Sequence, residues 1–438
     1  MLFKNISILD ENFQIRNNIY LKTEDEIITY IGEKCPNQNQ DKDKDKDKDK
    51  EGESIDGKGL LLLPGFYNSH AHSPMSLLRG YGEGLELHEW LNEKIFPFEK
   101  TLNSEDVYWG ALLSMAESMS YGIVSTTDMY FLTDGLAKAV LDSGMKANIS
   151  RSVSNTSRVN PHDDITFKEM VYTNESFQGI GSGRIIVDAS LHAEYTNDEP
   201  TIKAVADYAI ENNLRTHIHL AETEREVIEC RRRYGGISPV ELLLRNGVFD
   251  VKVTAAHCVW LDDRDREILR DKKVTVASCP VSNLKLASGI CDVNKLFDEG
   301  IRVTIGTDGA SSNNSLNFFE EMKIFALLGK YKSKNPARMK AEEVIKSATI
   351  DGAIAQGRES CGSLKVGNRA DIIAIDIESP SMNPRDNLIN NIVYSSSGRD
   401  VRITMVDGKI LYKDGEFTTL DIEKIKYEVG KRSAFQKM

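Results

Sequence analysis

The feature that most constrains this chain is the alternation, from residue 59 to residue 312, of short apolar segments with longer segments of helical periodicity. Short apolar runs bounded by Gly or Pro are typical of parallel strands that are buried on both faces. Between them lie helical segments such as SPVELLLRNG (238–247), which has Ser at an N-cap position and Gly just past its end. This alternation predicts an α/β fold, a (β/α)8 barrel of the TIM type. The apolar segments are GLLLLPG (59–65), YGIVSTTDMY (121–130), GRIIVDASLHAEY (183–195), LRTHIHLAE (214–222), VKVTAAHCV (251–259), KVTVASCPVSN (273–283) and IRVTIGTDGASS (301–312).

The two ends of the chain contain short strand-like segments in place of the long alternation. We expect residues 1–58 and 369–438 to form one small β-sandwich domain, with a terminal helix in the second part, beside a barrel of residues 59–368. Asp407-Gly408, between two alternating runs, is a strong signal for a two-residue hairpin. Residues 36–52, PNQNQDKDKDKDKDKEG, carry alternating charges and no apolar side chain, and are expected to be a disordered loop.

Charge and apolar content exclude several classes of protein. No apolar run approaches the ~20 residues that cross a bilayer, and Lys4 and Asn5 interrupt the N-terminus where a secretion signal would be apolar. The net charge of −12, without a concentrated basic stripe, argues against nucleic acid as a partner. Six cysteines without a C-x-x-C pair do not indicate a disulfide scaffold. We therefore expect a cytoplasmic protein that binds neither membranes nor nucleic acid.

Several of the predicted strands end in imidazole or carboxylate side chains. In a barrel the carboxyl ends of all strands meet on one face, so these side chains can converge there. Nitrogen and oxygen ligands without sulfur suit zinc or another first-row divalent ion such as iron or manganese. Hydrogen-bonded loop histidines are the alternative for the first pair, and His217 is expected in the core or behind a ligand. The residues are His70 and His72 after the first apolar run, His217, His219 and Glu222 in THIHLAE, His257 at the end of VTAAH, and Asp308 after VTIGT.

The motifs around these residues extend over essentially the whole chain. They are HAH after LPGFYNS, then HLAE, AHC, SCPVSNLKL and GTDGASSNN, followed by TIDGAIAQG (349–357) and GNRADIIAID (367–376). This set resembles the aminohydrolase branch of the amidohydrolase superfamily, and within that branch the methylthioadenosine/S-adenosylhomocysteine deaminases. The resemblance implies a metal-dependent hydrolase of C–N bonds in cyclic amidines. Its reaction would be hydrolytic deamination of the adenine 6-amino group of methylthioadenosine, S-adenosylhomocysteine or adenosine, releasing ammonia.

The resemblance also implies a metal centre. His70, His72, His219 and Asp308 would hold one divalent ion, with zinc favoured and iron or manganese open. An ion of this kind lowers the pKa of a bound water from ~15.7 toward 7. Two-metal relatives bridge their ions with a carboxylated Lys on the fourth strand, but IIVDASLHAEY (185–195) contains no Lys. A single metal ion is therefore expected.

Three residues would carry the proton transfers. Glu222 would protonate the purine ring nitrogen, which draws electrons away from the carbon under attack. His257 would hydrogen-bond the attacking hydroxide. Asp308 would receive the proton of the water and pass it to the leaving ammonia.

The same resemblance implies a set of substrate-binding residues. Ordinary helix packing for Trp90, a structural role for His192 and a helix N-cap for Ser312 are the alternatives. Where relatives carry a second arginine this chain has Asp163, and Arg158 is a candidate to replace it. The implied residues are Glu83 for the ribose hydroxyls, Trp90 beside the nucleoside, Arg151 for the carboxylate of S-adenosylhomocysteine, His192 for the purine and Ser312 for the base.

Two other kinds of function stay open. The same metal site could serve a deaminase of a bare base, of the guanine or cytosine type, or a hydrolase similar to triazine chlorohydrolases. Glu83 and Arg151 favour a ribosylated substrate with a carboxylate over these. A metal-free binding or scaffolding protein would have lost metal ligands, whereas the full set is present here. The expected partner is a small nucleoside, and the sequence leaves homo-oligomerisation open.

Overall fold

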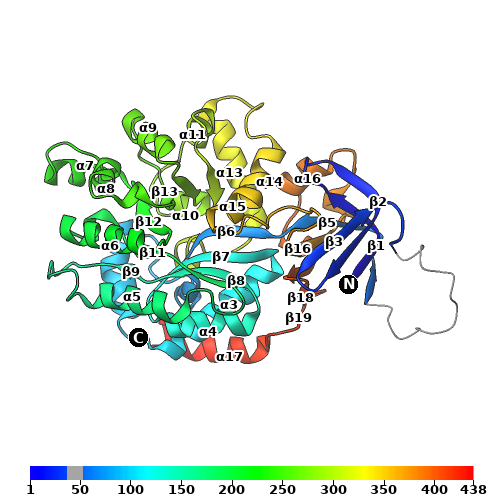
Figure 1. The fold of residues 1–438 in the computed structure, drawn as a ribbon, viewed down its shortest axis with the longest axis horizontal. Helices are drawn as coiled ribbons and strands as arrows, with labels where there is room; N and C mark the ends of the chain where they lie inside the picture. The colour runs from blue at the N-terminus through cyan, green and yellow to red at the C-terminus, as the bar shows by residue number, and fades with distance from the viewer. Residues whose placement is uncertain (37–52, 438) are drawn as a thin grey trace.

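The computed structural model describes residues 1–36 and 53–437. Two parallel sheets and one mixed sheet form the framework, and helices surround the parallel strands (Figure 1). The loop predicted at residues 36–52 lies, apart from Pro36, outside the described residues. Within the described part of the chain, none of the helices is both long and apolar enough to cross a membrane.

The two parallel sheets follow each other along the chain. One has the strand order β10-β8-β7-β6 and the other β15-β14-β13-β12-β11-β9. Only Arg151 separates β8 from β9, and only Asp188 separates β10 from β11, so each of these pairs occupies one strand position. The strands are β6 (Phe66–Ala71), β7 (Ile123–Met129), β8 (Lys146–Ser150), β9 (Ser152–Val153), β10 (Ile185–Val187), β11 (Ala189–Leu191), β12 (Thr216–Leu220), β13 (Val253–His257), β14 (Thr275–Ser278) and β15 (Val303–Ile305).

Strands from both ends of the chain meet in the mixed sheet, which lies at one side of the molecule in Figure 1. Its order is β19-β18-β17-β16-β5-β1-β2-β3, and β4 pairs with β1. The hairpin predicted at Asp407-Gly408 is confirmed, because it joins β17 to β18 with both φ angles positive, 47° and 74°. The strands are β1 (Leu2–Leu9), β2 (Ile15–Glu24), β3 (Ile27–Gly32), β4 (Ser54–Asp56), β5 (Leu60–Pro64), β16 (Ile372–Asp376), β17 (Val401–Val406), β18 (Lys409–Lys413) and β19 (Glu416–Phe417).

The first apolar run of the alternation has a different place from the expected one. Residues 60–64 form β5, which pairs with β1 and β16 in the mixed sheet, and the first parallel strand is β6. The run is apolar throughout because both of its faces are buried. Leu62 belongs to the small hydrophobic core of the mixed sheet, whereas Leu61 and Leu63 belong to the large core of the molecule.

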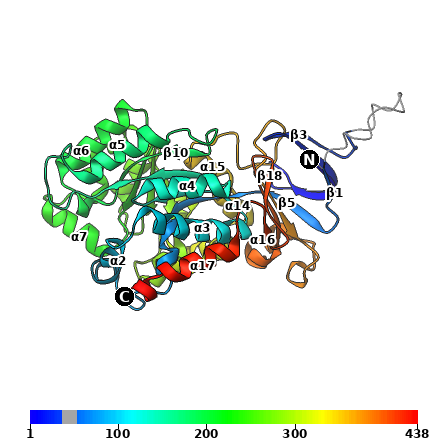
Figure 2. The same ribbon diagram turned by 90° about the horizontal axis from the view of Figure 1, so that it is seen from below.

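Most of the helices lie between the parallel strands in sequence. α8 begins and ends as its sequence predicts: the Ser238 hydroxyl accepts the Glu241 N–H at 3.1 Å, and Gly247 has a φ of 78°. α17 runs along α3 (Figure 2). The Arg432 guanidinium on α17 donates to Glu105 on α3 at 2.8 Å. The helices are α1 (Leu87–Glu89), α2 (Phe96–Glu99), α3 (Ser104–Ser120), α4 (Thr133–Ser143), α5 (Ile165–Phe177), α6 (Glu199–Glu211), α7 (Glu224–Arg233), α8 (Pro239–Arg245), α9 (Asp263–Asp271), α10 (Pro280–Lys285), α11 (Val293–Asp298), α12 (Ala310–Asn313), α13 (Phe318–Ser333), α14 (Ala341–Ala348), α15 (Ile350–Ala355), α16 (Leu388–Tyr394), α17 (Ile422–Arg432) and α18 (Ala434–Lys437).

Candidate metal centre and active site

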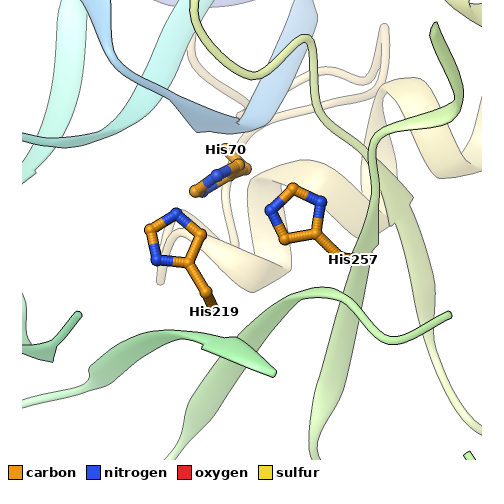
Figure 3. Close-up of side chains that lie close together, drawn as sticks. All are labelled: His70, His219 and His257. Atoms are coloured by element: carbon orange, nitrogen blue, oxygen red, sulfur yellow. The ribbon is translucent and has the colours of Figure 1, made fainter. Parts of the chain in front are cut away.

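Two overlapping groups of buried side chains at the carboxyl ends of the parallel strands could hold a metal ion. His70, His72 and Asp308 form one group, and His70, His219 and His257 form the other. Within each group the ligand atoms lie within 4.8 Å of one another. Figure 3 shows the rings of His70, His219 and His257 turned toward a common space. The structure therefore brings together residues from β6, β12, β13 and the segment after β15.

The outer hydrogen bonds of two histidines fix which ring nitrogen faces this space. Nδ1 of His72 lies 2.6 Å from the Met129 carbonyl oxygen, and Nδ1 of His219 lies 2.7 Å from the His192 carbonyl oxygen. Since a carbonyl only accepts, each Nδ1 carries the proton and, in the neutral ring, each Nε2 presents a lone pair. These two Nε2 atoms are 3.3 Å apart.

A cation is what such an arrangement requires. Oδ1 of Asp308 lies 3.3 Å from Nε2 of His72, so a carboxylate joins the two facing lone pairs. Burial lowers the pKa of His72, but the hydrogen bond and charge of Asp308 outweigh it and raise this pKa to about 9. The site thus attracts a positive charge, either a proton on Nε2 of His72 or a metal ion that would replace this proton. Its nitrogen and oxygen donors are those that divalent transition metals take.

His70 completes the donor set. Its Nδ1 lies 2.8 Å from Nε2 of His217, which explains the second histidine of THIHLAE: His217 orients the ring of His70. The other nitrogen of His70, Nε2, is buried without a hydrogen-bond partner in the described residues and lies 3.5 Å from Oδ1 of Asp308. An unpaired buried nitrogen is costly unless a ligand takes it up, so this atom also fits a metal ion.

Glu222 lies beside the two groups of potential ligands, next to His257 of the second group. Oε2 of Glu222 is 3.7 Å from Nε2 of His257, whose Nδ1 contacts Oδ1 of Asn283 at 2.9 Å. Burial raises the pKa of Glu222, which favours its protonated form. The Ser282 hydroxyl donates to Oδ2 of Asp308 at 2.6 Å and so fixes this carboxylate. The arrangement can hold a proton on Glu222 and an ionised Asp308 on either side of a reacting group.

A mostly apolar cavity is lined in part by the potential metal ligands and by Glu222. It includes Trp90, Arg151 and His192, three of the five residues expected to bind substrate. The Arg151 side chain is also held by the protein, since its Nε lies 2.6 Å from Oε2 of Glu169. The cavity is lined by His72, Met75, Leu87, Trp90, Leu91, Phe96, Glu99, Met129, Tyr130, Phe131, Arg151, Ser152, His192, Tyr195, His219, Glu222, His257, Leu286 and Asp308.

The other two expected residues do not line this cavity. The Glu83 side chain is 63% exposed and pairs with Nζ of Lys285 at 3.0 Å. Ser312 is buried in α12, where its hydroxyl donates to the Gly309 carbonyl at 3.2 Å. Arg158, the candidate second arginine, is exposed and is not among the lining residues.

Sequence reasoning missed one carboxylate of the cavity wall. Glu99 lies at the end of α2, and burial raises its pKa to about 7. Burial and the charge of Glu99 raise the pKa of Tyr130, a second residue of the cavity that the sequence did not single out. The available signal was a single acidic residue in the apolar segment IFPFE (95–99).

Comparison with known proteins identifies the family. Residues 61–411 match the amidohydrolase family. The chain belongs to the amidohydrolase family. Within it, the chain is 42% identical over 379 residues to a 5-methylthioadenosine/S-adenosylhomocysteine deaminase of Dictyoglomus thermophilum, covering 86% of this chain and 88% of that protein. It is 42% identical over 377 residues to a 5'-deoxyadenosine deaminase of Methanosarcina mazei, covering 86% and 87%.

Solved amidohydrolase-like structures share the fold of this family member. The crystal structure of a zinc-bound adenosine deaminase from Xanthomonas campestris superposes with a TM-score of 0.90 at 24% identity, covering 100% of this chain and 98% of that one. Atrazine chlorohydrolase from Arthrobacter aurescens, also with zinc, has a TM-score of 0.87 at 19% identity, covering 98% and 99%. These similarities establish a TIM-barrel-type amidohydrolase fold with parallel sheets.

Proposed function

We propose that this amidohydrolase is a metal-dependent hydrolase that removes the 6-amino group of adenine from nucleosides with a thioether at the 5′ position. Methylthioadenosine and S-adenosylhomocysteine are the first candidates, with adenosine as a third, and ammonia is the second product. The observation that carries the proposal is the convergence of metal donors, Glu222 and His257 at the base of one apolar cavity. The names of relatives at about 40% identity support the choice of substrate.

One divalent ion, with zinc favoured over iron or manganese, would be held by His70, His72, His219 and Asp308. The facing lone pairs and the unpaired Nε2 of His70 support this donor set. When bound, such an ion supplies a water of lowered pKa as the nucleophile. The remaining chemistry belongs to side chains of the protein.

Glu222 holds a proton because burial raises its pKa, and it donates this proton to the purine ring nitrogen next to the amino group. His257, oriented by Asn283, hydrogen-bonds the attacking water. Asp308, fixed by the Ser282 hydroxyl, takes one proton of this water and delivers it to the leaving amine. The second proton of the water returns to Glu222 as the carbonyl forms, which restores the acid. The apolar walls exclude other water from the reacting carbon.

The cavity wall supplies the contacts to the nucleoside. In this proposal His192 contacts the purine, Trp90 packs beside the nucleoside and Arg151 binds the carboxylate of S-adenosylhomocysteine. For the ribose hydroxyls we replace Glu83 by Glu99, because Glu99 lines the cavity and Glu83 pairs with Lys285 outside it. Ser312 is buried in α12 and is not among the residues that line the cavity, and its contact with the base remains part of the proposal.

The proposal includes the finer architecture. The eight parallel strand positions would close into a (β/α)8 barrel of residues 59–368, and the Asp308 N–H, which donates to the His70 carbonyl at 3.0 Å, supports contact between the first and last positions. Residues 1–58 and 369–438 would form a separate β-sandwich domain, in which the mixed sheet is one layer and also takes β5. The enzyme would act in the cytoplasm on a small nucleoside, as a monomer or a homo-oligomer.

The test is ammonia release from the purified protein across a panel of compounds. Methylthioadenosine, S-adenosylhomocysteine, 5'-deoxyadenosine and adenosine should be converted, with loss of adenine absorbance. Guanine and cytosine should not release ammonia, and atrazine should not release chloride, although proteins of this fold include a guanine deaminase and an atrazine chlorohydrolase. Turnover of a bare base or a triazine in place of the nucleosides would contradict the proposal.

A further inference from the structure

Glu226 is a buried carboxylate directly behind the proposed acid, and no step of the proposed reaction uses it. Its side chain is 3% exposed and lies on α7, four residues after Glu222. Oε1 accepts the Ala221 N–H and Oε2 accepts the Glu222 N–H, both at 2.8 Å. A carboxylate is the side chain that offers two acceptor oxygens side by side, so it matches two successive amides.

These hydrogen bonds are not those of an ordinary helix cap. Thr223 is the N-cap of α7, and its hydroxyl accepts the Glu226 N–H at 3.2 Å. In a capping box the Glu at this position bonds the N–H of the N-cap residue itself. Here the carboxylate reaches one and two residues further back, onto the segment between the metal donor His219 and Glu222.

This segment has a conformation that needs to be held. Ala221 has a φ of 49°, in the left-handed region that residues other than glycine rarely adopt. Its carbonyl oxygen accepts the N–H groups of Val259 and Trp260 at 3.0 and 2.9 Å. With the two bonds from Glu226, both sides of the turn are fixed, and the Glu222 side chain is directed into the cavity.

Keeping a carboxylate at this place costs energy. Burial and the charge of the neighbouring Glu194 raise the pKa of Glu226 to about 8. Glu194 itself is paired with Arg233, whose Nη2 lies 2.6 and 2.7 Å from its two oxygens, whereas Glu226 bonds the two backbone amides. Among the described residues, the Glu226 carboxyl group accepts hydrogen bonds from this turn alone, so the turn explains why a costly buried acid stands here.

We propose that Glu226 is a positioning residue: it fixes the backbone of Glu222 so that the acid points at the substrate ring. The inference rests on the proposed function of Glu222. Misplacement of a catalytic group by about 1 Å can cost about a hundredfold in rate. Glu226→Gln presents an amide NH2 to one backbone N–H and should therefore lower kcat by about tenfold to a hundredfold, with KM and bound metal unchanged.

A double-mutant cycle separates positioning from a general structural role. If Glu226 acts through Glu222, adding Glu226→Gln to Glu222→Gln should lower kcat by no more than about threefold, because the placement of a removed acid no longer matters. Glu194→Gln is the matched control, a buried carboxylate nearby that bonds Arg233 and not the turn; it should stay within about threefold of wild type. Equal losses in both backgrounds, or from the control, would overturn the inference.

A second measurement does not depend on turnover. Hydrogen exchange of the Ala221 and Glu222 amides should be faster in Glu226→Gln than in wild type, and unchanged in Glu194→Gln. Unchanged exchange in Glu226→Gln would overturn the inference, whereas absence of turnover by the wild type on every nucleoside would overturn the proposed function alone. If Glu226→Gln does not fold, Glu226→Asp keeps the carboxyl group, shortens the reach and should give the same pattern.

Discussion

The carboxyl group of Glu222 lies 3.7 Å from His257 and belongs to neither group of potential metal ligands among the described residues. We therefore expect Glu222→Gln to retain its metal and to lower kcat by about 10²–10⁴, the usual contribution of a positioned acid. Metal analysis and steady-state kinetics on the same preparation test this. His219→Ala is the contrast, because it removes a donor and should lose most of the metal. Loss of metal from Glu222→Gln would make Glu222 a ligand.

Arg151 is the residue through which substrates with and without a carboxylate can be distinguished. If it binds the carboxylate of S-adenosylhomocysteine, Arg151→Met should lower kcat/KM for this substrate by a factor equivalent to about 1.5–3 kcal/mol. The kcat/KM for methylthioadenosine should stay nearly unchanged. The two substrates share one purine, so a folding defect would depress both.

Glu169 offers a control for the same site, since its carboxylate holds Nε of Arg151 at 2.6 Å. Glu169→Gln should not reproduce the loss caused by Arg151→Met, and Glu175→Gln, an exposed residue of the same helix, should have no effect. Equal losses for both substrates in Arg151→Met would give this arginine a structural role.

Among single residues, the sequence predicted those site residues that lie at the carboxyl ends of parallel strands. His70 and His219 are the last residues but one of their strands and His257 is the last, and parallel strands bring their carboxyl ends together, so the convergence needed no further information. Glu83 and Glu99 lie in a segment of short helices, where the sequence does not fix which side chain turns inward. The difference between them came from tertiary packing, which places the half-buried Glu99 in the cavity wall and leaves Glu83 beside Lys285.

At the scale of elements, a buried ion network ties the parallel strands to the mixed sheet. Nζ of Lys146, at the start of β8, lies 2.6 Å from Oδ2 of Asp371 and 2.6 Å from Oδ1 of Asp407. Asp371 adjoins β16, and Asp407 lies in the hairpin of β17 and β18. The Lys146 side chain is 3% exposed, so its removal would leave the buried carboxylate of Asp371 without its cation, whereas Asp407 would keep Nε of Arg369 at 2.8 Å.

Lys146→Met should therefore lower the free energy of unfolding by about 3–5 kcal/mol. Chemical denaturation measures it, and Lys138→Met, which removes an exposed lysine paired with Asp142, should cost less than about 1 kcal/mol. Burial raises the pKa of Asp371, but the charge of Lys146 lowers it below its usual range. The contribution of the Lys146–Asp371 pair to stability is thus complete above the ordinary Asp pKa and is lost in acid. The free energies of unfolding of the wild type and of Lys146→Met should therefore converge at low pH.

The elements themselves were predictable to different degrees. The hairpin at Asp407-Gly408 and the caps of α8 depend on local backbone chemistry, and both appear as predicted. The apolar run of β5 carried no such local signal, because a strand buried on both faces reads alike in a parallel sheet and at the centre of a mixed one. Its pairing with β1 and with β16, the latter more than three hundred positions away in the sequence, decides its place.

At the scale of the whole molecule, the proposed metal ion would connect distant parts of the chain. Its donors come from β6, β12 and the segment after β15, so binding should stabilise the native state over the unfolded one. Removing the metal with a chelator should abolish turnover and lower Tm, by an amount equivalent to about 2.7 kcal/mol at a hundredfold excess of metal over Kd. Readdition of zinc, iron or manganese, each in turn, should restore both. An unchanged Tm with full activity after complete removal of the metal would contradict the site.

The mixed sheet has a consequence for how the protein is made. β5 pairs with β16 through contacts such as Leu62 with Ala374, yet a ribosome adding about 5–20 residues per second needs roughly 15–60 s to travel between them. During that interval the apolar strand leaves the exit tunnel with one edge unpaired. Nascent chains that stall before residue 372 should therefore recruit chaperones or aggregate, while those that stall after residue 413 have every strand that β5 requires.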